Sequence, residues 1–128
     1  MSLKDRLQVM VVDDMSTSRG LITQALDQIG IVHYQTENNG ELALNKLIAR
    51  PVHLVISDYN MPGLDGLQVL DALRRHQATQ RIGFILITGK ASKEVIEKGR
   101  QLAMNNFLRK PFSAQDLKIC IERVVGKL

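Results

Sequence analysis

The chain has 128 residues, of which 45% are hydrophobic and 23% are charged, and this composition fits one globular domain with a buried core. Its apolar runs of about four residues are far shorter than the roughly 20 residues of a membrane-spanning helix, so no membrane insertion is expected. No secretion signal is visible at the N-terminus, and the single cysteine, Cys120, cannot form an internal disulfide. These features favour a cytoplasmic protein.

The net charge of +4 is unevenly distributed along the chain. Residues 90–128 carry 9 Lys and Arg against 4 Asp and Glu, a net charge of +5, whereas residues 1–89 have a net charge of −1. Such a basic segment is either a solvated surface or a face for an acidic partner. Its aromatic residues do not alternate with Lys or Arg as a base-stacking surface would, so we expect no DNA binding.

The first half of the chain alternates strand-like apolar runs with helical patterns. The run Val9–Val12 is typical of a strand buried on both faces. A helix follows and ends at a capping glycine, Gly30, before a weaker strand at Ile31–Thr36. A second helix ends before Pro51, because the residue before a proline disfavours helix. The apolar stripes of these helices contain Leu21, Ile22, Ala25, Leu26 and Ile29, and Ala43, Leu44, Leu47 and Ile48.

The same alternation continues through the second half. Leu54–Ile56 and Phe84–Ile87 predict two further buried strands, and Asn106–Leu108 predicts a weaker one. Asp65 is the predicted N-cap of one helix, and Ser113–Asp116 has the pattern of a capping box for the last helix. The stripes of the three helices contain Leu67, Leu70 and Leu73, then Val95, Ile96, Leu102 and Ala103 with Gly99 as a weak point, then Leu117, Cys120, Ile121, Val124 and Leu128.

This order of elements predicts an α/β fold with right-handed crossovers. Five strands and five helices match a flavodoxin-like, doubly wound parallel sheet with strand order 2-1-3-4-5. We expect residues 1–128 to form a single domain, since no linker or repeat interrupts the pattern. In such sheets the binding site lies outside the carboxyl ends of the strands.

Polar residues stand at the carboxyl ends of four predicted strands. Asp13 and Asp14 follow the first strand, and Asp58 follows the third. Thr88 follows the fourth strand and Lys110 follows the fifth. Each residue alone has an ordinary structural explanation, but their convergence on one crevice indicates a functional site.

Three clustered carboxylates repel one another unless a cation lies among them. A hard divalent ion meets that need, and Mg2+ fits best because it takes one or two carboxylates together with waters and a phosphate oxygen. Zn2+ is not expected, since His33, His53 and His76 lack ligand spacing and no cysteine partner exists.

The same residues predict phosphoryl chemistry. Asp58 stands alone on its strand and is the candidate nucleophile toward phosphorus, while Asp13 and Asp14 would hold the ion. Thr88 and Lys110 are candidates to contact the phosphoryl oxygens after transfer, and lysine suits this task as a compact point charge.

Four motifs together resemble the receiver domain of bacterial two-component response regulators. They are the pair Asp13–Asp14, the stretch SDYNMPGLDG at residues 57–66, ITG at 87–89 and RKPF at 109–112. The resemblance covers essentially the whole chain, and the segments VVDDMSTSR, ALNKL and SDYNMPGLDGLQVL are similar to the single-domain, CheY-like chemotaxis group. It implies a CheY-like fold without an output domain, and a phosphoacceptor rather than a conventional enzyme.

The resemblance also implies roles in metal binding and phosphorylation. Asp58 would be the phosphoacceptor. Asp14 and Asp58 would bind Mg2+ directly, Asp13 would bind it largely through water, and Asn60 would bind it through its backbone carbonyl.

Further residues match the family's phosphoryl-binding and switch positions. Thr88 and Lys110 would bind the phosphoryl group, and the Lys110–Pro111 peptide bond would be cis. Thr88 and Phe107 would be the switch pair, whose movement remodels the face made by the fourth helix, the fifth strand and the fifth helix.

The implied partners follow from this switch. A histidine kinase would be the phosphodonor to a monomeric protein, and the remodelled face would bind a flagellar motor switch protein or a phosphatase. That face coincides with the basic segment at residues 90–128.

Three departures from the chemotaxis group stand out. Lys90 occupies a position where the group commonly has Glu, and with Asn60 it lies near the path of the attacking water, so we expect a different lifetime of the phosphorylated state. Phe107 replaces a frequent Tyr and removes a hydroxyl. The segment Met104–Phe107 replaces a small turn rich in Gly and Ala.

Alternative functions make their own predictions. A phosphatase of the haloacid dehalogenase type, with an Asp nucleophile and Mg2+, requires a second acid where the chain has Asn60. A phosphorylation-independent interaction module predicts a missing site residue, and a nucleotide-binding protein predicts a glycine-rich loop after the first strand. Within the receiver interpretation, signalling to a motor, a phosphate sink and a multistep phosphorelay remain open.

Overall fold

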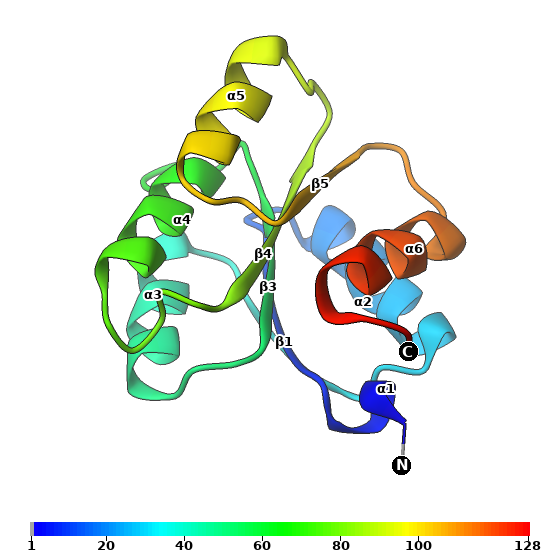
Figure 1. Ribbon diagram of the computed structural model, residues 1–128. Coiled ribbons are helices and arrows are strands. Elements are labelled where there is room, and N and C mark those ends of the chain that lie inside the picture. The colour runs from blue at the N-terminus through cyan, green and yellow to red at the C-terminus, as the bar shows by residue number, and fades with distance from the viewer. Residues whose placement is uncertain (1) are drawn as a thin grey trace.

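Within residues 2–128, which the computed structural model describes, five parallel strands form one sheet in the order β2-β1-β3-β4-β5 (Figure 1). The predicted flavodoxin-like architecture is therefore confirmed. The strands are β1 (Gln8–Val12), β2 (His33–Glu37), β3 (Leu54–Asp58), β4 (Gly83–Thr88) and β5 (Asn106–Arg109). The helices are α1 (Leu3–Arg6), α2 (Ser16–Ile29), α3 (Gly40–Ala49), α4 (Gly66–Arg75), α5 (Lys93–Gln101) and α6 (Ala114–Val125).

The described range contains six helices where five were predicted, and the additional one is α1. It has a single turn of four residues and no buried side chain, so it leaves no apolar periodicity in the sequence. Its start is fixed by Asp5, which accepts hydrogen bonds from both the backbone N–H and the hydroxyl of Ser2. None of the helices in residues 2–128 is long and apolar enough to cross a membrane.

The start of one predicted strand and the end of one predicted helix differ from the structure, because backbone hydrogen bonds at the ends of α2 and α5 set these limits. The strand predicted from Ile31 begins at His33, since the N–H of Ile31 returns to the carbonyl of Leu26 and closes α2. The helix predicted to include Ala103 ends at Gln101. Ala103 has a positive φ of 63°, and the N–H of the next residue returns to the carbonyl of Gly99. Local hydrogen bonds at helix ends, which apolar patterns do not record, set both limits.

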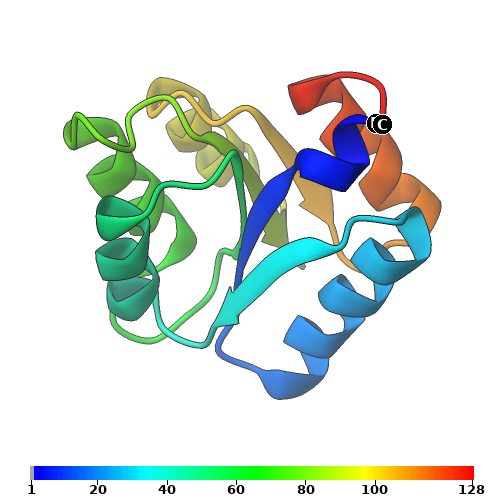
Figure 2. The ribbon, with the colours of Figure 1, turned by 90° about the horizontal axis from the view of Figure 1, so that it is seen from below.

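Successive residues of each central strand pack on opposite faces of the sheet. In β1, Val9 and Val11 join one apolar cluster, and Met10 and Val12 join another. The first cluster lies under α2 and α6, and the second lies under α3, α4 and α5 (Figure 1, Figure 2). Burial on both faces explains why continuous apolar runs mark these strands in the sequence.

Cys120 belongs to the core, as predicted. It lies on α6 with 5% of its surface exposed and packs in the cluster beneath α2 and α6. Burial raises the pKa of its thiol to about 11, so the reactive thiolate is disfavoured at neutral pH.

Arg74 ties the end of α4 to two distant loops. Its guanidinium donates to the carbonyls of Ile82 at 2.7 Å and Ala103 at 3.0 Å, and to Asn105 Oδ1 at 3.1 Å. The same Asn105 oxygen accepts the backbone N–H of Phe84 at 2.8 Å, at the start of β4. The segment Met104–Phe107, which replaces the small-residue turn of the chemotaxis group and leads into β5, is therefore fixed to the sheet through the side chain of Asn105.

Gly66 allows α4 to start against the strand that carries Asp58. A Cβ atom at this position would lie 2.5 Å from the carbonyl oxygen of Asp58 and 2.7 Å from Leu86 Cδ1. Asp65 caps the helix, as predicted, by accepting the N–H of Gln68 at 2.8 Å. The absence of a side chain at Gly66 thus lets the helix approach the backbone at the end of β3.

Substitution of Gly66 tests this close approach. Gly66→Ala is expected to lower the free energy of unfolding by about 1–3 kcal/mol, because the methyl group meets backbone that cannot rotate away. Gly20→Ala is the matched control, since a Cβ there has open space on an exposed helix, and its stability should be unchanged or higher by up to about 1 kcal/mol. Urea unfolding followed by circular dichroism measures both, and equal stability of Gly66→Ala and wild type would contradict the packing.

Candidate functional site

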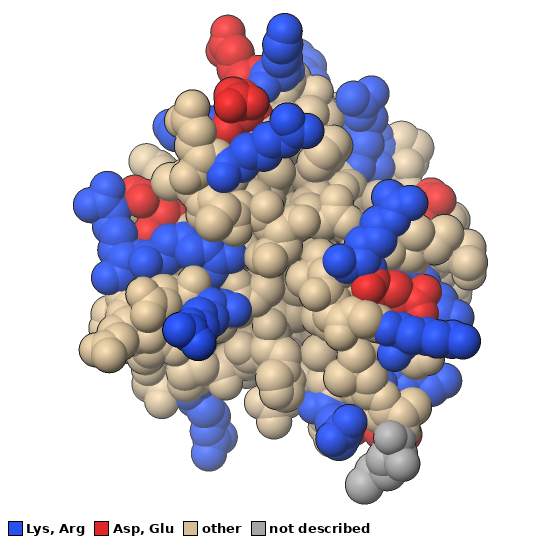
Figure 3. Space-filling view, in the orientation of Figure 1, with Lys and Arg blue, Asp and Glu red and all other residues tan. Residues whose placement is uncertain are grey.

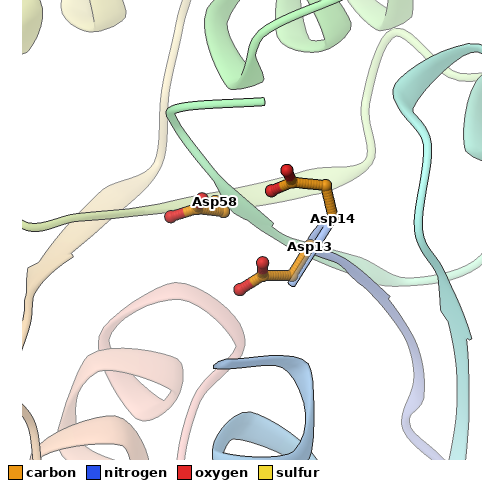
Figure 4. Close-up of side chains that lie close together, drawn as sticks. All are labelled: Asp13, Asp14 and Asp58. Atoms are coloured by element: carbon orange, nitrogen blue, oxygen red, sulfur yellow. The ribbon is translucent and has the colours of Figure 1, made fainter. Parts of the chain in front are cut away.

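Three aspartates meet at the carboxyl ends of the adjacent strands β1 and β3 (Figure 4). A carboxylate oxygen from each of Asp13, Asp14 and Asp58 lies within 4.8 Å of the others. Asp13 is fully buried, Asp58 is 6% exposed and Asp14 is partly exposed. The parallel register, which pairs Val12 with Ser57, explains this convergence of residues more than forty positions apart.

Lys110 supplies the cationic group of the cluster. It follows β5, and its Nζ lies 2.9 Å from Asp58 Oδ1 and 4.0 Å from Asp13 Oδ2. The next peptide bond, between Lys110 and Pro111, is cis. Two strands that are not neighbours thus place an ammonium group against the carboxylate at the end of β3.

Ser18 and Arg19, in the first turns of α2, complete the hydrogen bonding of Asp13. The Ser18 hydroxyl donates to Asp13 Oδ2 at 2.5 Å and accepts from Lys110 Nζ at 3.0 Å. Asp13 Oδ1 accepts the backbone N–H of Met15 at 3.0 Å, and Arg19 donates to the backbone carbonyl of Asp13. Sequence reasoning missed both side chains, although the segment after the aspartate pair is rich in hydroxyl groups.

Asp14 differs from Asp13 in having an unsatisfied oxygen. Its Oδ1 is buried and has no hydrogen-bond partner among residues 2–128. A buried carboxylate oxygen without a donor is unfavourable unless a cation meets it. Together with the all-oxygen ligand set, this orphaned atom makes the cluster a suitable site for a hard divalent ion such as Mg2+.

The ionisation of Asp58 is disfavoured by its surroundings. Burial is the largest cause and raises the pKa of Asp58 above its ordinary value. The hydrogen bond from Lys110 lowers the pKa, while the charges of Asp13 and Asp14 raise it again. The ionised form of Asp58 therefore carries a net electrostatic penalty, which added positive charge at the site would relieve.

Thr88 lies at the same edge of the sheet but is not joined to the acidic cluster. It is buried at the end of β4, where its hydroxyl donates to the carbonyl of Lys90 at 3.0 Å and accepts the N–H of Lys90 at 3.1 Å. Strand alternation places Thr88 on the face of Leu86, opposite to the face that Ile56 and Asp58 share. The structure thus separates Thr88 from the carboxylates and Lys110, which it brings together.

Phe107 lies on the same face of the sheet as Thr88. Its Cα pairs with that of Leu86 in the neighbouring strand β4, and its partly buried ring packs against the cluster beneath α3, α4 and α5. Thr88 is two residues beyond Leu86, so the two side chains are diagonal neighbours on one face. Asn60 and the side chain of Lys90 are exposed beyond the ends of β3 and β4.

A groove lies beside Lys110, between α2 and the start of α6. It has a volume of about 510 Å³ and continues from Ser18 and Lys110 over the apolar side chains of Leu21, Pro111 and Phe112. The α2 side of the groove is mixed, because Gln24 and Gln28 line it together with Leu21.

The comparisons with known proteins agree with this geometry. Residues 9–122 match the family model described as response regulator receiver domain. The chain is 38% identical over 128 residues to a probable chemotaxis protein CheY of Rhizobium etli, covering 100% of this chain and 99% of that protein. It is 29% identical to chemotaxis protein CheY-3 of Vibrio cholerae, covering 98% of this chain and 97% of that protein.

Solved structures show the same architecture. The chemotaxis protein CheY4 of Vibrio cholerae has a TM-score of 0.85 at 27% identity, covering 92% of this chain and 98% of that one. The receiver domain of a sensor histidine kinase from Pseudomonas aeruginosa has a TM-score of 0.84 at 23% identity, covering 94% of this chain and 98% of that one, and its fold is alike. That structure has a magnesium ion coordinated in its active site cleft.

The raised pKa of Asp58 predicts that the protein gains stability when this charge is removed. A carboxyl whose pKa is higher in the folded than in the unfolded state lowers stability as pH rises from the unfolded value of 3.8 through the folded one. Asp58→Asn should therefore raise the free energy of unfolding at pH 7 by about 1 kcal/mol, the size usual for substitutions that relieve a strained site.

Urea unfolding between pH 3.5 and pH 7, in chelator, measures this difference. The advantage of Asp58→Asn over wild type should grow with pH across that window. Glu97→Gln, at an exposed position of α5 with no ion pair to the described residues, is the control and should show no such growth. A constant or falling difference for Asp58→Asn would contradict the electrostatic description of the site.

Proposed function

The chain belongs to the response regulator receiver domain family, and we propose that it is a phospho-switch in which Asp58 accepts a phosphoryl group from a histidine kinase in a Mg2+-dependent reaction. A receiver domain is a phosphoacceptor rather than a conventional enzyme. The observation that carries the proposal is the position of Asp58, buried with Asp13 and Asp14 and hydrogen bonded to Lys110 at 2.9 Å. We propose that residues 1–128 act as one receiver domain, since the alignment spans 99% of the Rhizobium etli relative.

The proposed reaction makes Asp58 the nucleophile. A carboxylate oxygen attacks the phosphorus of a phosphohistidine, the P–N bond breaks, and the imidazole leaves as an acyl phosphate forms on Asp58. Lys110 is already in contact with the attacking carboxylate, so its ammonium is placed to contact a phosphoryl oxygen once transfer is complete. Hydrolysis of the acyl phosphate by water restores the carboxylate and releases inorganic phosphate.

Hydrogen bonding distinguishes the aspartates that would bind Mg2+ directly from the one that would bind it through water. Both oxygens of Asp13 are engaged, by Ser18 and by Met15, whereas Asp14 Oδ1 is free and Asp58 Oδ2 has no recorded hydrogen bond among the described residues. This favours Asp14 and Asp58 as direct ligands, with Asp13 acting through water. The backbone carbonyl of Asn60 is a further proposed ligand, which rests on the resemblance to the family alone. The ion, when bound, would supply positive charge that offsets both the clustered carboxylates and the phosphoryl oxygens.

The proposed switch starts at Thr88. To donate to a phosphoryl oxygen on Asp58, the Thr88 hydroxyl must leave the carbonyl of Lys90, which starts the loop leading into α5. Phe107, the diagonal neighbour of Thr88, borders the volume that Thr88 would vacate, so the two side chains are placed to move together. The change would reach the surface made by α5, β5 and α6.

That surface carries the basic residues of the C-terminal segment. Lys93, Lys98 and Arg100 lie on α5, Arg109 ends β5, and Arg123 lies on α6, and all five are exposed. Figure 3 shows many Lys and Arg side chains over α5 and α6, with fewer acidic ones among them. We propose that this face binds an acidic partner in chemotaxis, such as a flagellar motor switch protein or a phosphatase, in keeping with the chemotaxis proteins among the relatives.

Phosphorylation in the absence of a kinase tests the central proposal. Wild type incubated with Mg2+ and acetyl phosphate should acquire one acid-stable, base-labile phosphoryl group, detected by intact mass spectrometry. Asp58→Asn should acquire none, and chelation of Mg2+ should abolish the reaction. Equal modification of wild type and Asp58→Asn would refute Asp58 as phosphoacceptor.

The lifetime of the phosphorylated state tests the role of position 90. Lys90→Glu introduces the residue common in the chemotaxis group near the path of the attacking water, and we expect it to change the dephosphorylation rate by about tenfold, which corresponds to about 1.4 kcal/mol in the activation barrier. Loss of label after removal of the phosphodonor measures the rate. Lys93→Glu makes the same charge change on α5 and serves as the control, so identical rates for Lys90→Glu and Lys93→Glu would contradict a specific role.

A further inference from the structure

Ser18 is hydrogen bonded within the site, unlike the two hydroxyl residues that precede it in the sequence. Its hydroxyl oxygen lies between the buried Asp13 and Lys110, in contact with both, while Ser16 and Thr17 in the same turn are exposed. We propose that Ser18 is a positioning residue for phosphoryl transfer, whose hydroxyl keeps the Lys110 ammonium on Asp58 by satisfying Asp13 in its place. This inference rests on the proposed phosphorylation of Asp58.

The chemistry of the three groups fixes the direction of each hydrogen bond. A lysine ammonium can only donate, so Ser18 must accept from Lys110. The single hydroxyl proton is then available to Asp13 Oδ2, and a hydrogen bond from a hydroxyl to an ionised carboxylate is short and strong. Ser18 therefore donates to Asp13 and accepts from Lys110 at the same time.

The distances show which interaction the hydroxyl prevents. Lys110 Nζ is 2.9 Å from Asp58 Oδ1 but 4.0 Å from Asp13 Oδ2, although Asp13 is the more deeply buried carboxylate. A fully buried carboxylate oxygen that loses its donor takes the nearest available one. Without the Ser18 hydroxyl, that donor is the ammonium of Lys110, which would move toward Asp13 and away from Asp58.

This displacement has two opposite consequences. Lys110 would no longer stand where the phosphoryl oxygens arrive, so phosphorylation of Asp58 should slow. Asp58 Oδ1 would be released from its ion pair, so the affinity of the aspartate cluster for Mg2+ should stay equal or increase. General damage to the site would instead weaken phosphorylation and metal binding together.

Four substitutions separate the hydroxyl from the rest of the side chain. Ser18→Ala removes it, and Ser18→Thr retains it with a methyl group that the groove beside Ser18 has room to accept. Ser18→Val has nearly the shape of Thr without the hydroxyl. Ser16→Ala is the control, because it makes the same chemical change at an exposed position of the same turn.

The experiment measures the phosphorylation rate with acetyl phosphate and, by titration calorimetry, the Kd for Mg2+. Ser18→Ala and Ser18→Val should be phosphorylated about tenfold more slowly than wild type, within the 10- to 100-fold range usual for residues that orient active-site groups. Both should bind Mg2+ with a Kd no higher than that of wild type. Ser18→Thr and Ser16→Ala should keep phosphorylation rates within about twofold of wild type. That change is much smaller than the effect expected from losing one hydrogen bond to a charged group.

The outcomes that overturn the inference differ from those that overturn the proposed function. Equal rates for Ser18→Thr and Ser18→Val, or a raised Kd for Mg2+ in Ser18→Val, would refute the positioning role even if Ser18→Ala failed to fold. In either case wild type would still be phosphorylated and Asp58→Asn would not. Failure of wild type itself to be phosphorylated would refute the proposed function instead.

Discussion

The site depends on one ion pair, between Lys110 and Asp58, whose single positive charge does not balance the three carboxylates around it. Lys110 brings a single positive charge to three carboxylates, and it contacts Asp58 directly while Asp13 is satisfied by Ser18. The pKa of Asp58 is raised despite this contact, so the cluster retains unbalanced negative charge. A protein that keeps such a penalty in its core gives up stability for reactivity, because the same penalty favours the arrival of a metal cation.

The proposed phosphorylation site and the proposed switch pair lie on opposite faces of the sheet. Asp13, Asp58 and Lys110 form the chemical site with Ser18 from α2, whereas Thr88 and Phe107 lie over the face covered by α3, α4 and α5. β4 joins the two halves, since it is the neighbour of both β3 and β5. Thr88, at the end of β4, therefore lies between the strand that carries Asp58 and the strand that carries Phe107.

The fold and the cluster were predictable because they depend on periodicity and strand ends. Buried strands read as continuous apolar runs, and a parallel sheet brings their carboxyl ends together, which placed Asp13, Asp14, Asp58 and Lys110 in one crevice. The role of Ser18 was not predictable, since an exposed and a bridging serine look alike in a helix start. The hydrogen bonds of Arg74 were missed because polar contacts between distant loops leave no period in the sequence. The short helix α1 was missed because a single turn without a buried side chain leaves no apolar period either.

Part of the positive charge of the protein lies away from the acidic site, at the ends of the helices. Each helix from α4 to α6 has a basic residue in its last turn, where it meets the negative end of the helix dipole. Helices that return antiparallel to a parallel sheet end at the edge opposite to the strand tips, so these cations lie away from Asp58. Charges separated by more than about 8 Å are largely screened at physiological ionic strength. The cation affinity of the crevice is therefore set mainly by the groups at the strand tips, which include the aspartates, Lys110 and Arg19. The exposed basic residues at the helix ends remain free for a partner of opposite charge.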